Sequence, residues 1–232
     1  MSKRMDAVRA LVEKGKRYTL KEAVEIIKKA PQPKFDQSVE FAVDLDVDPK
    51  ASDQMVRGTV TLPHGTGKTL KILVFAKGEA ERDAKEAGAD FVGAEELIQK
   101  VNGGWLAFDV VISTPDLMRE VGKLGKVLGP RGLMPSPKAG TVTMDVGRAV
   151  KESKMGKVEF KMDKQADIHL SVGKNSFSAE QIEANSLVFL EALWKAKPAS
   201  AKGRYVKTLA ISTTMGPGIR LNPTEGRPEA SL

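Results

Sequence analysis

The sequence predicts two domains: a three-layer, Rossmann-like α/β domain inserted into a discontinuous two-layer α+β domain with an antiparallel sheet. Segments near both ends of the chain alternate apolar and polar residues, which is typical of antiparallel strands with one solvated face. Segments in the middle are continuous apolar runs separated by helices, which is typical of parallel βαβ units. We therefore expect the outer domain over 1–66 and 159–232 and the inserted domain over 67–158.

The first part of the outer domain is expected to hold one helix and two strands. Thr19 and Glu22 form a capping box before the apolar spacing of LKEAVEIIKKA, and Pro31 ends this helix. The strand after this helix, VEFAVDLDV, contains Asp44 and Asp46 and is followed directly by Asp48. These three acids could bind a hard cation, although a solvated strand face is the simpler interpretation. The strands are VEFAVDLDV, with Val39, Phe41, Val43, Leu45 and Val47 facing one side, and RGTVTL.

The inserted domain is expected to alternate strands and helices up to Gly156. Its last helix is preceded by a segment rich in Gly and Pro, which should be an ordered loop. In order, the expected elements are the strand KILVFA, the helix EAERDAKEAG, the strand DFVG, the helix AEELIQKV, the strand FDVVIST, the single helix PDLMREVGKLGKVL, the loop GPRGLMPSPKAGTV and the helix VGRAVKESK.

After residue 157 the alternating pattern returns. KVEFKM and DIHLSV are expected to be antiparallel neighbours. Ser178 and Gln181 form a second capping box, which opens a long helix through Trp194. YVKTLAIST is expected to be the final strand, and the tail from residue 213 onward is expected to be extended or loose.

Composition excludes several classes of protein. The chain has no cysteine, which excludes a disulfide scaffold and any thiolate metal site, and its two histidines, His64 and His169, lie in different segments. We expect no metal, no cofactor and no catalytic residue. No apolar run reaches the ~18 to 20 residues that span a membrane, and no signal peptide is recognisable, so we expect a cytoplasmic protein without a membrane partner.

The net charge of +7 favours a polyanionic partner, most often a nucleic acid, although a merely soluble basic protein is the alternative. The charge is clustered: residues 1–34 hold ten basic and four acidic residues. Aromatic residues make up only 5%, which favours recognition of a folded RNA's backbone and shape over base-by-base reading. A second basic segment, residues 121–140, contains Lys123, Lys126, Arg131 and Lys138 and no acid.

The segment TLPHGTGKTL contains half of a phosphate-binding loop, Gly67-Lys68-Thr69. The first glycine of that motif is replaced by Leu62, Pro63 lacks an N–H, and an expected strand follows where the motif needs a helix. A nucleotide-dependent enzyme is therefore disfavoured. We expect a hinge instead, near 64–68 and 155–159, with free backbone rotation at Gly65, Gly67 and Gly156.

Two further features leave alternatives open. Phe35, just before the first strand, can stack on a base or belong to the core. The stretch STTMGPGIRLNP combines short hydroxyls, glycines and a methionine, which suits close contact with RNA but also fits an ordinary strand end.

Four stretches, KFDQSVEF, DQMVRGTVTLPHGTGK, VLGPRGLMPSPKAGTV and STTMGPGIRLNP, resemble the L-one family of bacterial large-subunit ribosomal proteins, in order and over nearly the whole chain. The resemblance implies a two-domain, non-enzymatic protein that binds large-subunit rRNA at the mobile stalk near the tRNA exit site. It also implies help in releasing deacylated tRNA and repression of the protein's own operon mRNA, by a chain that is monomeric when free.

The resemblance also assigns an RNA surface. Glu40 should accept a hydrogen bond from a 2′-hydroxyl or base amine, and Met215 should pack on a sugar or base. Gln37 stands where an acid is expected and TEGRPEASL extends the tail, but neither is expected to touch the surface. The four basic residues of 121–140 are possible secondary RNA contacts. The implied residues are Phe35, Ser38, Glu40, His169, Lys174, Thr213, Thr214, Met215, Gly216 and Pro217.

Overall fold

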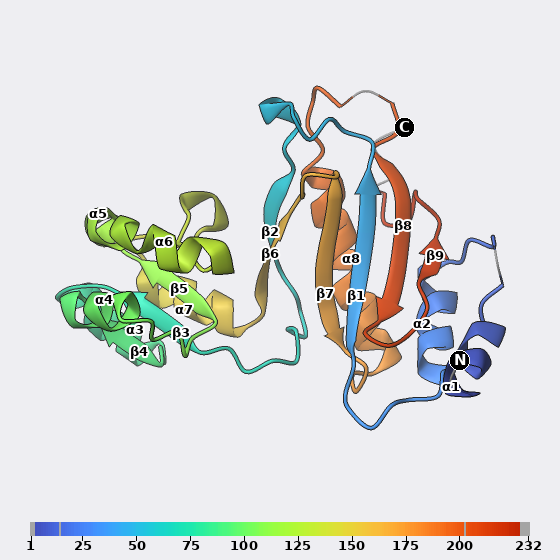
Figure 1. The fold of residues 1–232 in the computed structure, drawn as a ribbon, viewed down its shortest axis with the longest axis horizontal. Helices are drawn as coiled ribbons and strands as arrows, with labels where there is room; N and C mark the ends of the chain where they lie inside the picture. The colour runs from blue at the N-terminus through green and yellow to red at the C-terminus, as the bar shows by residue number, and fades with distance from the viewer. Residues whose placement is uncertain (1–2, 14, 202, 228–232) are drawn as a thin grey trace. The chain divides into compact units, whose positions relative to one another are not determined.

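A computed structural model describes residues 3–13, 15–201 and 203–227 (Figure 1). The chain divides into two compact units, an outer unit of 1–67 with 158–232 and an inner unit of 68–157. The predicted fold class is confirmed, because an antiparallel sheet belongs to the outer unit and a parallel sheet to the inner one. None of the helices in the described ranges is long and apolar enough to span a bilayer.

The outer unit is built on a four-stranded antiparallel sheet with the order β7-β1-β8-β9. β1 is central and pairs with both β7 and β8, although these strands lie more than a hundred residues later in the chain. Helices α2 and α8 pack against one face. The bounds are α2 Leu20–Lys29, β1 Ser38–Leu45, β7 Asp167–Lys174, α8 Ala179–Lys195, β8 Val206–Thr213 and β9 Ile219–Leu221.

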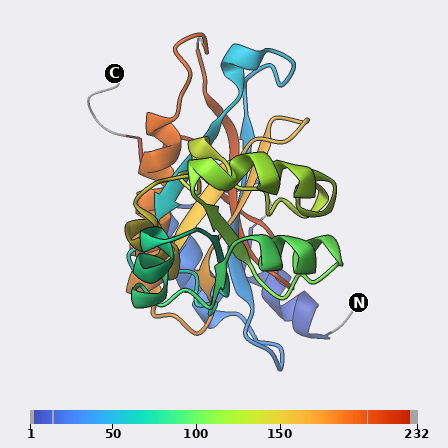
Figure 2. The same ribbon diagram turned by 90° about the vertical axis from the view of Figure 1, so that its left-hand side faces the viewer.

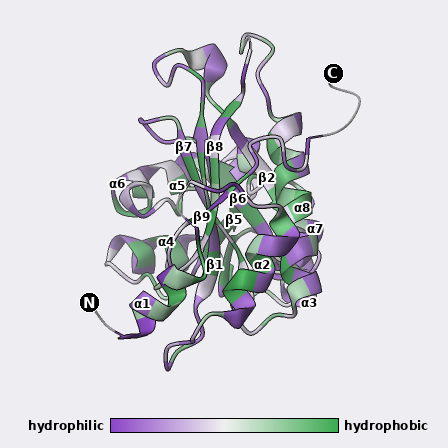
Figure 3. Cartoon of the chain, turned by 90° about the vertical axis from the view of Figure 1, so that its right-hand side faces the viewer, coloured by the Kyte–Doolittle hydropathy of each residue, from purple (hydrophilic) through white to green (hydrophobic). Residues whose placement is uncertain are grey.

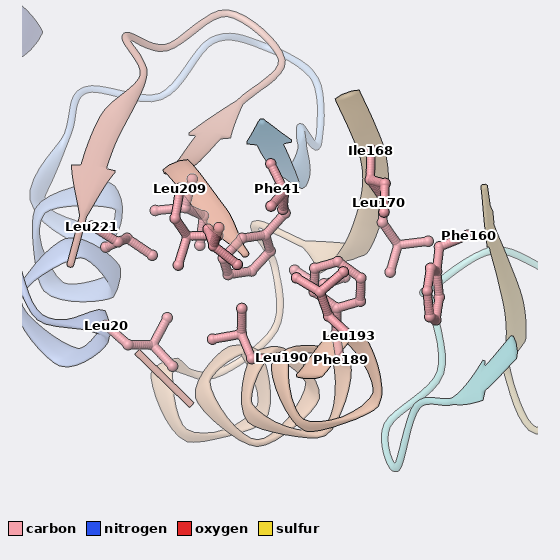
Figure 4. Close-up of a cluster of buried hydrophobic side chains, with 14 of the residues drawn as sticks. Leu20, Phe41, Phe160, Ile168, Leu170, Phe189, Leu190, Leu193, Leu209 and Leu221 are labelled. Atoms are coloured by element: carbon pink, nitrogen blue, oxygen red, sulfur yellow. The ribbon is translucent and has the colours of Figure 1, made fainter. Parts of the chain in front are cut away.

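The alternation of β1 decides which face carries the core. Phe41 and its neighbours on that face are buried, and the Phe41 ring lies 5.5 Å from that of Phe189 on α8. Figure 4 shows these rings with leucines of both helices and of β7, β8 and β9. Both predicted capping boxes are present, at Thr19 and Ser178. Figure 3 shows hydrophobic and hydrophilic stretches on both α2 and α8, as expected for helices that cover a sheet.

Two predictions for the outer unit are wrong, and one helix was not predicted. KVEFKM, strand β6 (Lys157–Lys161), does not pair with β7; it pairs with β2 (Arg57–Thr61) in a separate two-stranded sheet. Gly58 makes this pairing close, because a Cβ there would lie 2.6 Å from the Phe160 ring. β8 is not the final strand, since β9 follows it. Helix α1 (Lys3–Ala10) was not predicted, because only Val8 of it is buried and its apolar spacing is weak. A short 3-10 turn, η1, covers Ser52–Gln54.

The inner unit is a three-layer α/β fold around a parallel sheet with the order β4-β3-β5 (Figure 2). β3 is buried along its whole length, which explains its continuous apolar sequence. Its alternate residues join two cores, one against α3 and α7 and the other against α4 and the segment 117–128. The bounds are β3 Ile72–Phe75, α3 Glu79–Glu86, β4 Phe91–Gly93, α4 Glu95–Asn102, β5 Val110–Ser113 and α7 Val146–Lys154.

The single helix predicted over 115–128 is wrong, because this segment consists of short helical pieces. Gly122 and Gly125 begin new pieces, which agrees with the low helix propensity of glycine. The apolar spacing survives, since Leu117, Val121 and Leu124 are all buried. The pieces are η2 Pro115–Leu117, α5 Met118–Val121, η3 Gly122–Leu124 and α6 Gly125–Leu128, and the loop after them holds η4 Gly129–Arg131 and η5 Pro137–Ala139.

Candidate nucleic-acid interface

The face of the outer sheet opposite α2 and α8 presents polar and small side chains, and we call it the open face. Glu40 of β1 pairs with Ser171 of β7 and with Ser212 of β8, and Ala42 pairs with His169. Glu40 and His169 therefore point to the same side, and both are exposed. Because their neighbours have short side chains, a ligand can approach the strand backbone closely here.

At one end of the open face, three segments far apart in the sequence meet at Ser38. Its N–H donates to the Thr214 hydroxyl (3.1 Å), and the Thr214 N–H donates to its carbonyl (3.1 Å). Its own hydroxyl accepts a hydrogen bond from the Lys174 ammonium (3.1 Å). An ammonium has three donors, so two remain for a partner. The structure thus brings Ser38, Lys174 and Thr214 together at what we call the corner.

The tail after β8 is ordered and forms a hairpin to β9, so of the two expected forms, extended or loose, the loose one is wrong here. Residues 214–218 are the connection, which we call the hairpin tip. The Gly216 N–H donates to the Thr213 carbonyl (2.9 Å), and a Cβ on Gly216 would lie 2.3 Å from the Thr213 hydroxyl. A side chain at this position would therefore displace the Thr213 hydroxyl. Met215 is 50% exposed, and Pro217 follows at the end of the tip.

Gln37 supports the hairpin tip directly, which corrects the expectation that it does not touch the RNA surface. Its side chain is only 2% exposed. Its Oε1 accepts the Met215 N–H (2.8 Å), and its Nε2 donates to Gln32 Oε1 (2.9 Å). The amide thus holds the backbone of Met215 while that side chain stays exposed. No spacing in the sequence signals this contact, because it joins residues 178 positions apart.

Two basic residues that motif reasoning missed hold the loops around the corner. Arg4 of α1 donates to the carbonyl of Met215 (3.1 Å) and so braces the tip from the other side. Lys28 of α2 donates to the carbonyls of Asn175 and Phe177, and burial lowers the pKa of its ammonium. Both cations bind carbonyl groups of the protein's own backbone. Part of the positive charge of the basic segment 1–34 therefore stabilises the fold.

Phe35 lies in the loop before β1 and is 51% exposed. This exposure decides between the two alternatives left by the sequence, because it shows that the ring is not part of the core. It is available to stack on a partner.

His169 lies beside two carboxylates. One potential ligand atom from each of Asp163, Asp167 and His169 lies within 4.8 Å of the others. The Asp163 carboxylate already accepts the N–H groups of Asp167 (2.9 Å) and Gln165 (2.7 Å), and these hydrogen bonds lower its pKa. We interpret the cluster as a turn between β6 and β7 held by a side chain, and no metal is assigned to it.

The four basic residues of 121–140 belong to the inner unit and lie on short helical turns. Lys123, Lys126, Arg131 and Lys138 are all exposed. Within the ranges that the structure describes, none of the four forms a hydrogen bond or ion pair, so their charges are available to a polyanion.

The glycines of the two crossings between the units have positive φ, at +63° for Gly65, +72° for Gly67 and +101° for Gly156. The turn at Gly65 is fastened to α8, because Asn185 donates to its carbonyl (2.9 Å) and accepts the His64 N–H (3.0 Å). As predicted, the segment then enters strand β3 and opens no helix. It therefore lacks the helix N-terminus that a phosphate loop uses.

A family model, ribosomal protein L1p/L10e, matches residues 26–217. The chain belongs to the ribosomal protein L1p/L10e family. It is similar to the large ribosomal subunit protein uL1 of Protochlamydia amoebophila, with 58% identity over 97% of this chain and 95% of that protein. It is also similar to the large ribosomal subunit protein uL1 of Kosmotoga olearia, with 54% identity over 95% of this chain and 96% of that protein.

The L1p/L10e match covers every residue of the predicted RNA surface, from Phe35 to Pro217. It leaves out α1 with Arg4 and the chain after residue 217. Part of the support for the hairpin tip therefore comes from outside the segment that defines the family.

Proposed function

We propose that this member of the L1p/L10e family is a structural, non-enzymatic constituent of the large ribosomal subunit that binds rRNA through the corner, the hairpin tip and the open face. The observation that carries the proposal is the meeting of Ser38, Lys174 and Thr214 in one hydrogen-bonded corner. These residues come from three separate segments, and the exposed Met215 and Phe35 lie on loops that adjoin it. The relatives, which are named as large-subunit proteins, support the rRNA partner.

The chemistry of the surface favours recognition of a folded RNA by shape and hydrogen bonding. Glu40 is an exposed carboxylate, so it accepts hydrogen bonds from 2′-hydroxyls or base amines and repels phosphates. Lys174 supplies a phosphate contact, while Met215 and Phe35 supply apolar contacts to a sugar or base. Cations and acids are mixed on and around this surface, with Lys174 and Arg4 on one side of the balance and Glu40 on the other. Its binding should therefore depend less on salt than that of a basic patch.

The remaining parts of the proposal concern the ribosome as a whole. We place the RNA partner at the mobile stalk near the tRNA exit site, where the protein assists release of deacylated tRNA. The exposed cations of 121–140 are secondary RNA contacts. The same corner represses translation by binding the protein's own operon mRNA, and the free protein is a monomer.

A salt-controlled binding assay tests the central proposal. It compares a stalk rRNA fragment, an unrelated folded RNA and ATP, with Met215→Ala and Glu40→Gln as site variants. Each variant should weaken stalk binding by roughly 1 to 3 kcal/mol if it loses a desolvated contact. Met144→Ala is the matched control, because Met144 is also exposed (67%) but belongs to the inner unit. Unchanged stalk binding by both site variants contradicts the assignment.

The same assay separates two other classes of protein. A generic basic RNA chaperone predicts steep salt dependence with little discrimination between the two RNAs. A nucleotide-dependent enzyme predicts saturable ATP binding that Lys68→Ala abolishes.

Movement of the two units about the crossings near Gly67 and Gly156 is a separate part of the proposal. A spectroscopic distance between labels on the two units should change when the RNA binds. One identical distance in the free and bound states contradicts the hinge.

A further inference from the structure

A cavity of about 330 Å³ lies on the outer unit, at the end of β8 that is remote from the hairpin tip. Val206, which lines it, pairs with Leu45, whereas Thr213, which precedes Thr214 of the corner, pairs with Val39. Seven residues of extended strand separate these positions, which corresponds to roughly 23 Å. The cavity is therefore distinct from the proposed RNA surface.

The lining of this cavity is strongly cationic. Arg17, Lys197, Arg204 and Arg227 all line it, and none of the described residues that line it is acidic. Among the residues that the structure describes, the side chains of Arg17, Lys197 and Arg204 form no hydrogen bond or ion pair. Like charges at the positions of Arg17, Lys197 and Arg204 repel one another, so an anion bound among them would be stabilised.

The wall of the cavity is aromatic, and the ring of Trp194 already packs against other groups. The Trp194 ring lies 5.6 Å from that of Tyr205, and the Arg227 guanidinium lies over it at 5.8 Å. The Trp194 N–H donates to the Glu225 carbonyl (3.1 Å). The cavity thus offers guanidinium and ammonium groups to a ligand and does not resemble a platform for stacked bases.

The chain after β9 builds one side of the cavity and is fastened in place. The Glu225 carboxylate accepts the Leu20 N–H (3.3 Å), and a Cβ on Gly226 would lie 2.5 Å from the Leu190 Cβ. Arg227 follows directly, so its position depends on this docking. Residues 224–227 of the extension TEGRPEASL thus contact the outer unit, while 228–232 lie outside the described residues.

We propose that this cavity binds a phosphate group. Guanidinium groups match the tetrahedral oxygens of phosphate through paired N–H donors, and two or more of them around one cavity favour a phosphate over a carboxylate of single charge. The phosphate comes either from the backbone of the RNA bound at the corner or from a free phosphate or nucleotide. The first source rests on the proposed function, whereas the second does not.

Arg17→Gln and Arg204→Gln test the site, with Lys195→Gln as the matched control. Lys195 loses the same charge on the same part of the molecule, but it pairs with Glu191 and does not line the cavity. If an RNA phosphate occupies the cavity, each site variant should weaken stalk RNA binding about tenfold and lower the slope of log affinity against log salt by about one. The control should retain the wild-type slope.

Inorganic phosphate and AMP test the free source. Each is titrated while the indole N–H signal of Trp194 is followed by NMR, and Trp105→Phe assigns this signal because the chain has two tryptophans. A saturable shift that Arg204→Gln abolishes supports the site. If this shift occurs while the arginine variants keep the wild-type slope of log RNA affinity against log salt, the source is a free phosphate.

A wild-type RNA slope in both arginine variants, together with a Trp194 signal that phosphate and AMP do not move, overturns the proposal. Failure of the proposed function gives a different pattern. In that case Met215→Ala leaves RNA binding unchanged, while the phosphate and AMP titrations still report on the cavity.

Discussion

Replacing Gln37 by Leu should detach the hairpin tip from the sheet while keeping the size of the side chain. The change removes two hydrogen bonds, to the Met215 N–H (2.8 Å) and to Gln32 (2.9 Å). At a net value of about 0.5 to 1.5 kcal/mol each, the free energy of unfolding should fall by roughly 1 to 3 kcal/mol. Burial of the leucine offsets part of this loss. For a unit of this size each kcal/mol corresponds to about 3 °C in Tm, so we expect a decrease of at most roughly 3 to 9 °C.

The effect on RNA binding follows from the released backbone. Ordering one residue costs about 1 to 2 kcal/mol, and Met215 must be ordered again when RNA binds. The affinity for a stalk fragment should therefore fall about 5- to 30-fold. Thermal unfolding measures the first effect and a titration at fixed salt measures the second.

Gln37→Glu is the informative control. A carboxylate still accepts the Met215 N–H but cannot donate to Gln32, whose own amide donates to the carbonyls of Ile27 and Ala30. This variant should lose stability yet bind RNA almost as tightly as the wild type. If Gln37→Leu has the same Tm and the same RNA affinity as the wild type, Gln37 does not position the tip and the reasoning is wrong.

Three further predictions concern stability. Asn185→Leu removes three hydrogen bonds of a fully buried side chain. The free energy of unfolding, measured in denaturant, should therefore fall by about 2 to 4 kcal/mol. A loss below about 1 kcal/mol contradicts this prediction. Tyr205→Phe should leave stability unchanged or raise it by about 1 kcal/mol, since the buried hydroxyl has no partner among the described residues, and a clear loss would reveal one. Because the pKa of Asp163 is lowered in the folded state, its contribution is present above its ordinary pKa of about 3.9 and is lost as pH falls through the lowered value. The stability difference between the wild type and Asp163→Asn should therefore shrink below about pH 4 in acid titrations, and a difference independent of pH opposes this assignment.

The features that the sequence predicted correctly depend on interactions between residues that are close in the chain. The capping boxes at Thr19 and Ser178 and the alternation through Phe41 depend on neighbours within a few residues, so each could be recognised without the fold. The pairing of β6 with β2 could not, because both possible neighbours of β6 alternate in the same way. In the observed pairing Gly58 lies close to the Phe160 ring, a contact that only the assembled sheet shows.

Some residues of the candidate interface could be predicted from the sequence, and others could not. Met215, Gly216 and Phe35 stand out by residue type or motif, so the sequence could nominate them. Gln37, Arg4 and Lys28 act by holding backbone carbonyls and N–H groups of distant segments, and nothing in their spacing distinguishes them from ordinary surface residues. Positioning residues of this kind become visible only when the chain is folded.

The central place of β1 has a consequence for the order of events during synthesis. β1 is made early, but β8, which pairs with one of its edges, ends at Thr213. At about 5 to 20 residues per second, β1 waits on the order of ten to thirty seconds for that partner. The inner unit, whose pairings lie within one continuous segment, can fold during this interval. A nascent or truncated chain would therefore carry a finished inner unit but lack the corner that we propose to bind RNA, so rRNA could select completed molecules.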